Sequence, residues 1–249
     1  MHFRSSLAAL LLALTVAPPK VCAVSPFVGE LTGTLRVTAG RNRGLRGTIY
    51  LFVGDSGTVG AAVTFKGGSG GCFRGVANLT AGKVTLTPLS KQLGGHVKIS
   101  VRLKARGSSV TGRGTFVNNN RKPSKRFSGV ITIGGREDIT SNSVGVYLGG
   151  LNISAGPDSP NSWPIQLFVA NDGTAGGDTF DPQGNGFAFQ GTGDLTSGAF
   201  ALPVIAGKES LAGITGNVVG NFVTPSLANG SFTLSNGDRG TVSFPKVAP

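Results

Sequence analysis

Cysteine and histidine are the scarcest reactive residues in this sequence, with two of each among 249 residues. Two cysteines exclude a disulfide-rich scaffold, and so few cysteine and histidine side chains do not supply the usual donors of a zinc site. Charged residues make up only 14% of the chain, against about 25% in ordinary soluble domains. The charge is also one-sided, because 23 Lys and Arg face 11 Asp and Glu and give a formal net charge of +12. This excess predicts an anionic partner.

Long apolar runs are missing as well. The run at 7–16 has ten residues, about half of what a membrane-spanning helix needs. It follows a basic start and precedes small residues, a pattern that predicts a secretory signal peptide over 1–23, cleaved near Ala23. Cys22 raises lipidation as an alternative. The residues before it disfavour that reading, because a small residue is expected immediately before a lipidated cysteine.

Short runs of alternating apolar and polar residues fill the rest of the chain. In 98–106, for example, Ile99, Val101 and Leu103 alternate with basic residues and serine. A period of two predicts β-strands with one buried face. Turn sequences such as DSG, TAG, NDG and SNGD separate the runs and suit tight hairpins. The predicted fold class is all-β, an antiparallel up-and-down meander in a barrel or sandwich, with no amphipathic helix.

An internal repeat organises these strands. At an offset of 116 residues, IYLFVGDSGTVG at 49–60 matches IQLFVANDGTAG at 165–176, and LRVTAG at 35–40 matches LNISAG at 151–156. The offset falls to 111 near the end of the first copy, which carries a longer loop, NNNRKPSKR. The sequence predicts two duplicated repeats of about eight strands each, forming two small β-barrels or one larger closed sheet. The predicted limits are a first repeat at 24–136, a linker at 137–143 and a second repeat at 144–249.

The two copies differ sharply in charge. Residues 24–136 hold 18 Lys and Arg but 2 Asp and Glu, whereas residues 144–249 hold 3 and 7. Glycine and apolar positions match between the copies, whereas the charged positions do not. The fold therefore does not require the basic residues of the first copy. The alternation along the strands places many of these basic residues, Lys83 included, on one face of the sheet, and two loops contribute further basic residues. We predict that this surface binds polyanions, because a face kept only for solubility would mix both signs. The predicted binding residues are Arg36, Arg41, Arg43, Arg46, Arg74, Lys98, Arg102, Lys104, Arg106, Arg113, Arg121, Lys122, Lys125 and Arg126.

Candidates for catalysis are few and isolated. Ser69 lies in GGSGG, which fits G-x-S-x-G, but that motif marks a nucleophile only at a strand-to-helix elbow. Here it is a glycine loop between two predicted strands. His96 has no acid or thiol near it in sequence, and Cys72 opens a predicted strand as a small buried residue. The sequence therefore predicts no enzymatic activity and no cofactor.

Oxygen-bearing side chains gather in one stretch of the second copy. Asn171, Asp172, Asp178, Asp181 and Asn185 are of the type that binds Ca²⁺. Their spacing matches no EF-hand, and Asp and Asn are also common turn residues. A turn role is therefore favoured over a metal site formed by Asp172, Asp178 and Asp181.

The Gly/Thr-rich hairpins FVGDSGTVGAAVTF and FVANDGTAG resemble the β-meander repeats of uncharacterised secreted proteins of environmental bacteria. The resemblance extends over the mature chain but is one of general sequence character only, and no motif in it assigns a functional residue. What it implies is a secreted all-β protein.

The leading prediction is a secreted, periplasmic or cell-surface protein without catalytic activity. Its basic first repeat would contact acidic polysaccharide, envelope polymer or anionic lipid headgroups. Nucleic acid is a less natural partner for a secreted protein. The best-placed phenylalanines also alternate with the apolar, core-facing residues, and so do not lie among the basic residues where they could stack on bases. Two alternatives stay open, an outer-membrane β-barrel pore with a basic lumen and an enzyme of unrecognised type. One Trp and two Tyr are too few for the two aromatic girdles of such a pore.

Overall fold

The computed structural model describes residues 25–40, 42–65, 70–89, 96–120 and 122–249. The first eight strands are β1 (Gly29–Gly40), β2 (Arg46–Val53), β3 (Thr58–Phe65), β4 (Gly70–Asn78), β5 (Lys83–Pro88), β6 (Val97–Arg106), β7 (Ser109–Asn118) and β8 (Phe127–Glu137). The next eight are β9 (Gly145–Ala155), β10 (Asn161–Val169), β11 (Thr174–Phe180), β12 (Gly186–Gly193), β13 (Ala199–Lys208), β14 (Gly216–Thr224), β15 (Leu227–Leu234) and β16 (Arg239–Ala248). Two short 3-10 helices, η1 (Pro123–Lys125) and η2 (Glu209–Leu211), lie in loops.

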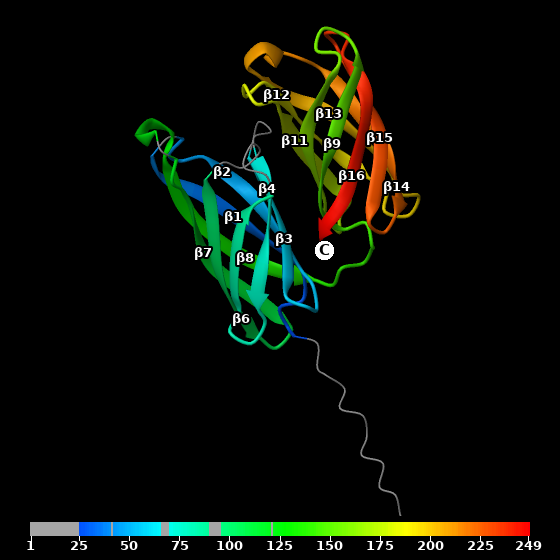
Figure 1. The fold of residues 1–249 in the computed structure, drawn as a ribbon. Helices are drawn as coiled ribbons and strands as arrows, with labels where there is room; N and C mark the ends of the chain where they lie inside the picture. The colour runs from blue at the N-terminus through cyan, green and yellow to red at the C-terminus, as the bar shows by residue number, and fades with distance from the viewer. Residues whose placement is uncertain (1–24, 41, 66–69, 90–95, 121) are drawn as a thin grey trace, which may run out of the picture.

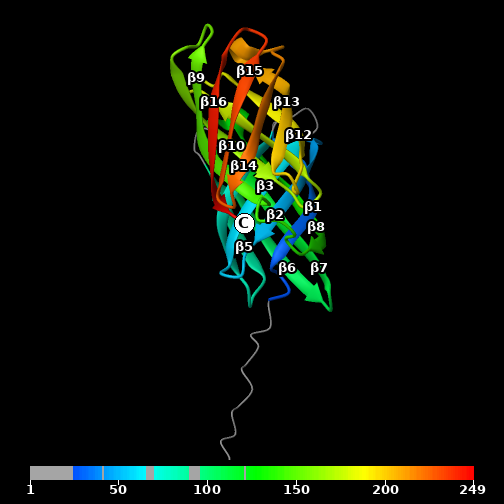
Figure 2. The same ribbon diagram turned by 90° about the vertical axis from the view of Figure 1, so that its right-hand side faces the viewer.

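Each set of eight strands closes into its own antiparallel barrel (Figure 1 and Figure 2). Strands that follow one another in sequence are neighbours in the sheet, and β1 pairs with β8 as β9 pairs with β16. Closure leaves no unpaired strand edge in either sheet. The all-β meander is therefore confirmed, and of its two predicted forms the protein has two small barrels.

The two barrels share strand order and the register of their closing seams, which confirms the duplication. Leu35 on β1 pairs with Ile131 on β8. Leu151 on β9 pairs with Val242 on β16. The two leucines are 116 residues apart and their partners 111 residues apart, as the two sequence offsets predict.

Apolar side chains point into the interior of the first barrel, and charged side chains lie outside it. In β6, Ile99, Val101 and Leu103 are almost fully buried, and the residues between them are exposed. Successive residues of a strand point to opposite faces. Arg102 and Lys104 are therefore on the outer surface. This orientation is the reverse of the basic lumen that the pore alternative requires.

Two equivalent glycines let the last strands of each barrel approach closely. Phe116 on β7 pairs with Gly129 on β8, and Phe232 pairs with Gly240 in the second barrel. A Cβ atom at Gly129 would lie 2.1 Å from the carbonyl oxygen of Arg36 and 2.4 Å from the Phe116 ring. The ring thus covers the glycine and fills the space that another side chain would need.

A third apolar cluster joins the two barrels. Strands β3 and β4 lie against β9, β10, β11 and β16 (Figure 1). Tyr50 on β2 stacks on Phe168 on β10, with ring centroids 5.4 Å apart. We call these buried residues the inter-barrel cluster: Phe52, Ala62, Cys72, Leu89, Val144, Val146, Phe168, Ala170 and Ala248.

The connection between the barrels is tied to the second one. Strand β8 ends at Glu137 and β9 begins at Gly145. Within the connection, the backbone N–H of Thr140 donates to the Asn171 side chain at 3.1 Å. The same side chain donates to the backbone oxygen of Asp138 at 2.7 Å. Asn171 lies in the turn between β10 and β11, so this turn holds the connecting segment in place.

Candidate polyanion-binding face

Three basic residues form a row across the outside of the first barrel. Lys83 on β5 pairs with Arg102 on β6, which pairs with Arg113 on β7. All three side chains are exposed. Paired residues of neighbouring strands share a face, and strands lie about 4.8 Å apart, so this basic row spans about 10 Å. Lys83 is absent from the predicted binding set, yet it completes the row.

Further basic side chains lie on the outer surface of the first barrel. Arg36 on β1 pairs with Arg46 on β2, which makes a second pair of like charges across two strands. Like charges directly opposite one another repel, so the sheet itself gains nothing from either arrangement. The other exposed basic residues on the outer faces of these strands are Arg74, Lys98, Lys104 and Arg106.

The acidic residues of the first barrel lie elsewhere. Glu30 is buried at the start of β1, Asp55 is in the turn between β2 and β3, and Glu137 is the last residue of β8. In the closed barrel β2 is four strands away from β6, the middle strand of the basic row, and β3 is three strands away, so the turn between them lies far from the row around the barrel. Among the described residues the one ion pair is Arg136 with Asp138. The basic row therefore faces solvent without an acidic partner from the described chain.

The second barrel offers an internal comparison for the basic row. Its equivalent row consists of Ala199, Asn221 and Asn229, paired in the same way across β13, β14 and β15. These side chains are also exposed, but none carries a charge. The same scaffold is thus built with and without the row of like charges.

Both basic loops predicted from the sequence lie at one end of the first barrel. One connects β1 to β2 and the other precedes β8. Arg126 donates from Nε to the backbone oxygen of Asn120 at 2.9 Å. Arg41 and Arg121 lie outside the described residues. We call the exposed basic residues of these loops the basic rim: Arg43, Arg46, Lys122, Lys125 and Arg126.

The candidate catalytic residues lie in different surroundings. His96 is exposed just before β6. Cys72 is 2% exposed within the inter-barrel cluster. Burial, followed by the nearby charge of Asp178, raises the pKa of the Cys72 thiol well above its usual range. Ser69 lies outside the described residues. The described chain does not bring His96 and Cys72 into one site.

The three carboxylates considered for calcium are separated in the structure. Asp172 precedes β11 and accepts the backbone N–H of Thr174 at 2.8 Å, as in an Asx turn. Asp181 follows β11 and accepts the backbone N–H of Asn185 at 2.8 Å. Asp178 is buried within β11. Within the described ranges no group of three His, Cys, Asp or Glu residues is placed to hold a metal ion.

A different group of carboxylates, of which the sequence analysis singled out only Asp181, lies at one end of the second barrel. Asp158, Asp181 and Asp238 come from three separate loops. The backbone N–H of Asp158 donates to Asp238 Oδ1 at 3.0 Å. Burial, then the charge of Asp238 and a hydrogen bond to it, and last the charge of Asp181 raise the pKa of Asp158. This end of the second barrel is acidic, whereas the equivalent end of the first is basic.

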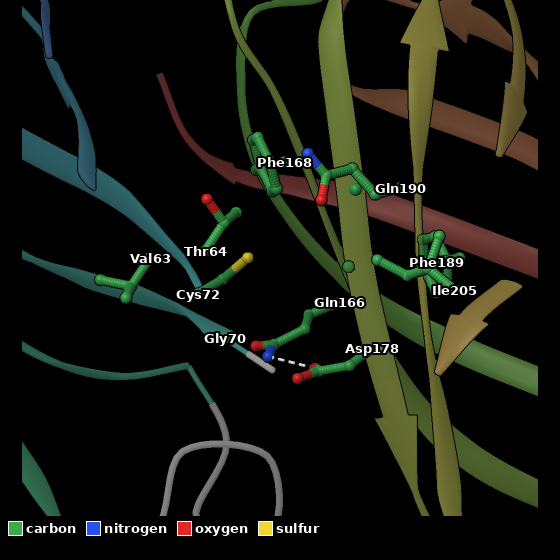
Figure 3. Close-up of a pocket in the computed structure, with 13 residues that line it drawn as sticks. Val63, Thr64, Gly70, Cys72, Gln166, Phe168, Asp178, Phe189, Gln190 and Ile205 are labelled. Atoms are coloured by element: carbon green, nitrogen blue, oxygen red, sulfur yellow. Dashed lines mark hydrogen bonds between the residues drawn. The ribbon is translucent and has the colours of Figure 1, made fainter. Parts of the chain in front are cut away.

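A small pocket lies between the barrels (Figure 3). It brings Gln166 and Asp178 of the second barrel next to Cys72 and Thr64 of the first. The Gln166 side-chain amide donates to the Asp178 carboxylate. Its oxygen is buried without a hydrogen-bond partner from the described residues. The volume is about 20 Å³, enough for about one water molecule, so the pocket is part of the interface and not a ligand site.

These features define a tandem of two closed eight-stranded barrels, of which the first is strongly basic. No family model matches the sequence, and no curated protein is similar to it. One similar solved structure is a protein of unknown function from the DUF3598 family, from Nostoc punctiforme. It is 12% identical, with a TM-score of 0.28 over 90% of this chain and 97% of that chain. So low a TM-score supports no argument about function. No helix in the described part of the chain is long and apolar enough to cross a membrane.

Proposed function

We propose that this protein binds acidic polymers through the outer face of its first barrel. The observation that carries the proposal is the basic row, in which Lys83, Arg102 and Arg113 are paired across three strands. The second barrel forms the same row without charge, so the fold does not need these side chains. Because they repel one another in the free protein, a partner of opposite sign supplies the reason for them.

An extended polymer suits this face better than a small anion does. The charges spread over several strands on the convex outside of a barrel, and Lys104 and Arg106 continue them along β6. A ligand must therefore present several negative groups along its length. Acidic polysaccharide or anionic envelope polymer has this form, and the signal peptide predicted over 1–23 would bring the protein to such polymers.

The proposed role is binding without catalysis. Two observations support it. Cys72 is buried with a raised thiol pKa, which disfavours the nucleophilic thiolate at neutral pH. His96 is exposed at the start of β6, away from the interior of the barrel.

The test exchanges the basic row for the neutral row of the second barrel. The variant Lys83→Ala, Arg102→Asn, Arg113→Asn should bind heparin about tenfold more weakly than the parent chain at low salt, because three exposed charge contacts are lost together. Binding by the parent should weaken steeply as salt rises, since exposed charges are screened beyond about 8 Å at physiological ionic strength. Affinity is measured by titration calorimetry over a salt series.

The reverse exchange provides the matched control. Ala199→Lys, Asn221→Arg, Asn229→Arg adds the same row to the second barrel, and we expect tighter heparin binding. A separate variant with Lys98, Arg102, Lys104 and Arg106 changed to Ser removes the charges of β6 and keeps its buried face. Unchanged affinity in both charge-removal variants would show that the basic face is only solvated surface.

A further inference from the structure

An apolar cavity lies inside the first barrel, near the end that carries the basic rim. Its volume is about 150 Å³. A second hollow of about 190 Å³ adjoins it and shares Phe65, Gly70 and Phe127 with it. Six strands contribute apolar side chains to the wall of the first cavity: Leu35, Val63, Phe73, Val97, Phe116 and Ile131. A dry apolar cavity of about 150 Å³ accepts a molecule the size of benzene.

The duplicated barrel has large side chains near the corresponding end. At the 116-residue offset, Trp163 occupies the position of Gly47, and Phe187 occupies the position of Gly71. Both aromatic residues belong to the core of the second barrel. The loop between β13 and β14 adds Leu211, which is 4% exposed and packed in the same core. The scaffold therefore tolerates large side chains at the positions of Gly47 and Gly71, where the first barrel has glycine. The first barrel in turn has Phe65 and Phe127, which line the cavity, where the second has Asp181 and Asp238.

The basic rim stands beside the opening of this space. Asn42 and Leu45 line the adjoining hollow, and Arg43 lies between them in the chain. Phe127 lines both spaces, and the exposed Arg126 precedes it. The two acidic residues of the first repeat are both at the opposite end of the barrel, where β1 begins and β2 meets β3. An apolar interior and a cationic margin thus meet at one end.

We infer that this end of the first barrel binds an amphipathic anion, with a short apolar tail in the cavity and an anionic head group at the basic rim. Eight-stranded barrels are wide enough to hold one small ligand when their interior is not filled by side chains. A carboxylate or sulfate head cannot be buried in the apolar wall without great cost, so it stays at the margin, where cations meet it. The site is separate from the basic row and does not depend on the polymer-binding proposal.

The experiment titrates the purified chain with octanoate and, in parallel, with neutral octanol. The parent should bind octanoate saturably. Val97→Phe places a larger side chain at the half-buried cavity wall and should weaken octanoate at least tenfold. Val97→Ala is the matched control, since it keeps the cavity open and should retain binding. Ile99→Phe repeats the blocking test from a second wall position. Thermal unfolding confirms that each variant is folded.

The charge of the margin is tested separately. Replacing Arg43, Lys122 and Lys125 with Gln should weaken octanoate at least tenfold and leave octanol unchanged. The Lys83→Ala, Arg102→Asn, Arg113→Asn variant should bind octanoate as the parent does, so failure of one proposal is distinguishable from failure of the other. No saturable octanoate binding by the parent, or equal binding by folded Val97→Phe and Ile99→Phe, would overturn the inference.

Discussion

At the scale of single residues, Glu30 stands out as a buried carboxyl group where the barrels meet. It is 3% exposed and accepts the backbone N–H of Asn171 at 2.7 Å. Burial raises its pKa from the ordinary 4.5 to about 7, and the charges of Asp172 and Glu137 add to this, against the hydrogen bond from Asn171. Between these two pH values the folded protein keeps a proton that the unfolded chain has lost. The contribution of Glu30 to stability is therefore greatest below about pH 4.5 and falls as the pH rises to about 7.

Glu30→Gln should remove this pH dependence. The variant keeps an acceptor for the Asn171 N–H but carries no charge, so it should be more stable than the parent at pH 8 and similar at pH 4.5. We expect its midpoint of thermal unfolding at pH 8 to be higher by a few degrees, as about 1 kcal/mol corresponds to about 2–4 °C at this size. Asp55→Asn, which changes an exposed carboxylate of the same barrel, is the control. Parallel pH profiles for parent and Glu30→Gln would contradict the assignment.

At the scale of strands, Gly129 on β8 lets the two neighbouring strands, β1 and β7, pack closely against β8. In Gly129→Ala the new Cβ atom would meet the backbone of Arg36 and the ring of Phe116. We expect a loss of about 1–3 kcal/mol in the free energy of unfolding, the usual cost of overpacking. The measurement is chemical denaturation followed by circular dichroism.

Gly134→Ala on the same strand is the matched control. A Cβ atom there has nothing within 4 Å. The expected change is within about 0.5 kcal/mol, as for other surface substitutions. Equal losses for the two variants would show that strand propensity, and not the packing of Phe116, determines the effect.

Much of the strand pattern was predictable from the sequence, because alternation and turn residues are local signals. The pairing of Arg102 with Arg113 follows from the short turn between β6 and β7, which fixes register. The place of Lys83 in the basic row depends on the register of β5 with β6. These strands are joined by a longer connection, so the sequence alone does not determine their register. The cavity was not predictable either, since its wall comes from strands far apart in sequence.

The sequence also contains a sign of the inter-barrel cluster, namely runs of consecutive apolar residues that break the alternating pattern. Leu51, Phe52 and Val53 are consecutive and all buried, and so are Leu167, Phe168 and Val169. A strand with three adjacent buried residues is covered on both faces. Equivalent runs in the two copies therefore indicate the surfaces through which the barrels meet.

At the scale of the whole molecule, the barrels should unfold together because an apolar interface joins them. Phe168 is 3% exposed against the first barrel. Phe168→Asp buries an unpaired charge there, which costs about 3–5 kcal/mol, and should split one calorimetric transition into two. Phe168→Leu keeps an apolar side chain and should retain the single transition. Two transitions in the parent chain would show that the interface does not couple the barrels.

The basic row also has a consequence for the free protein. Three like charges fixed across neighbouring strands store electrostatic repulsion for as long as nothing neutralises them. The neutral row of the second barrel stores none. In the proposed function, a bound polyanion would form contacts and also relieve this repulsion, which is present in the sheet before binding. The proposed binding would therefore gain from the release of a repulsion that the second barrel does not hold.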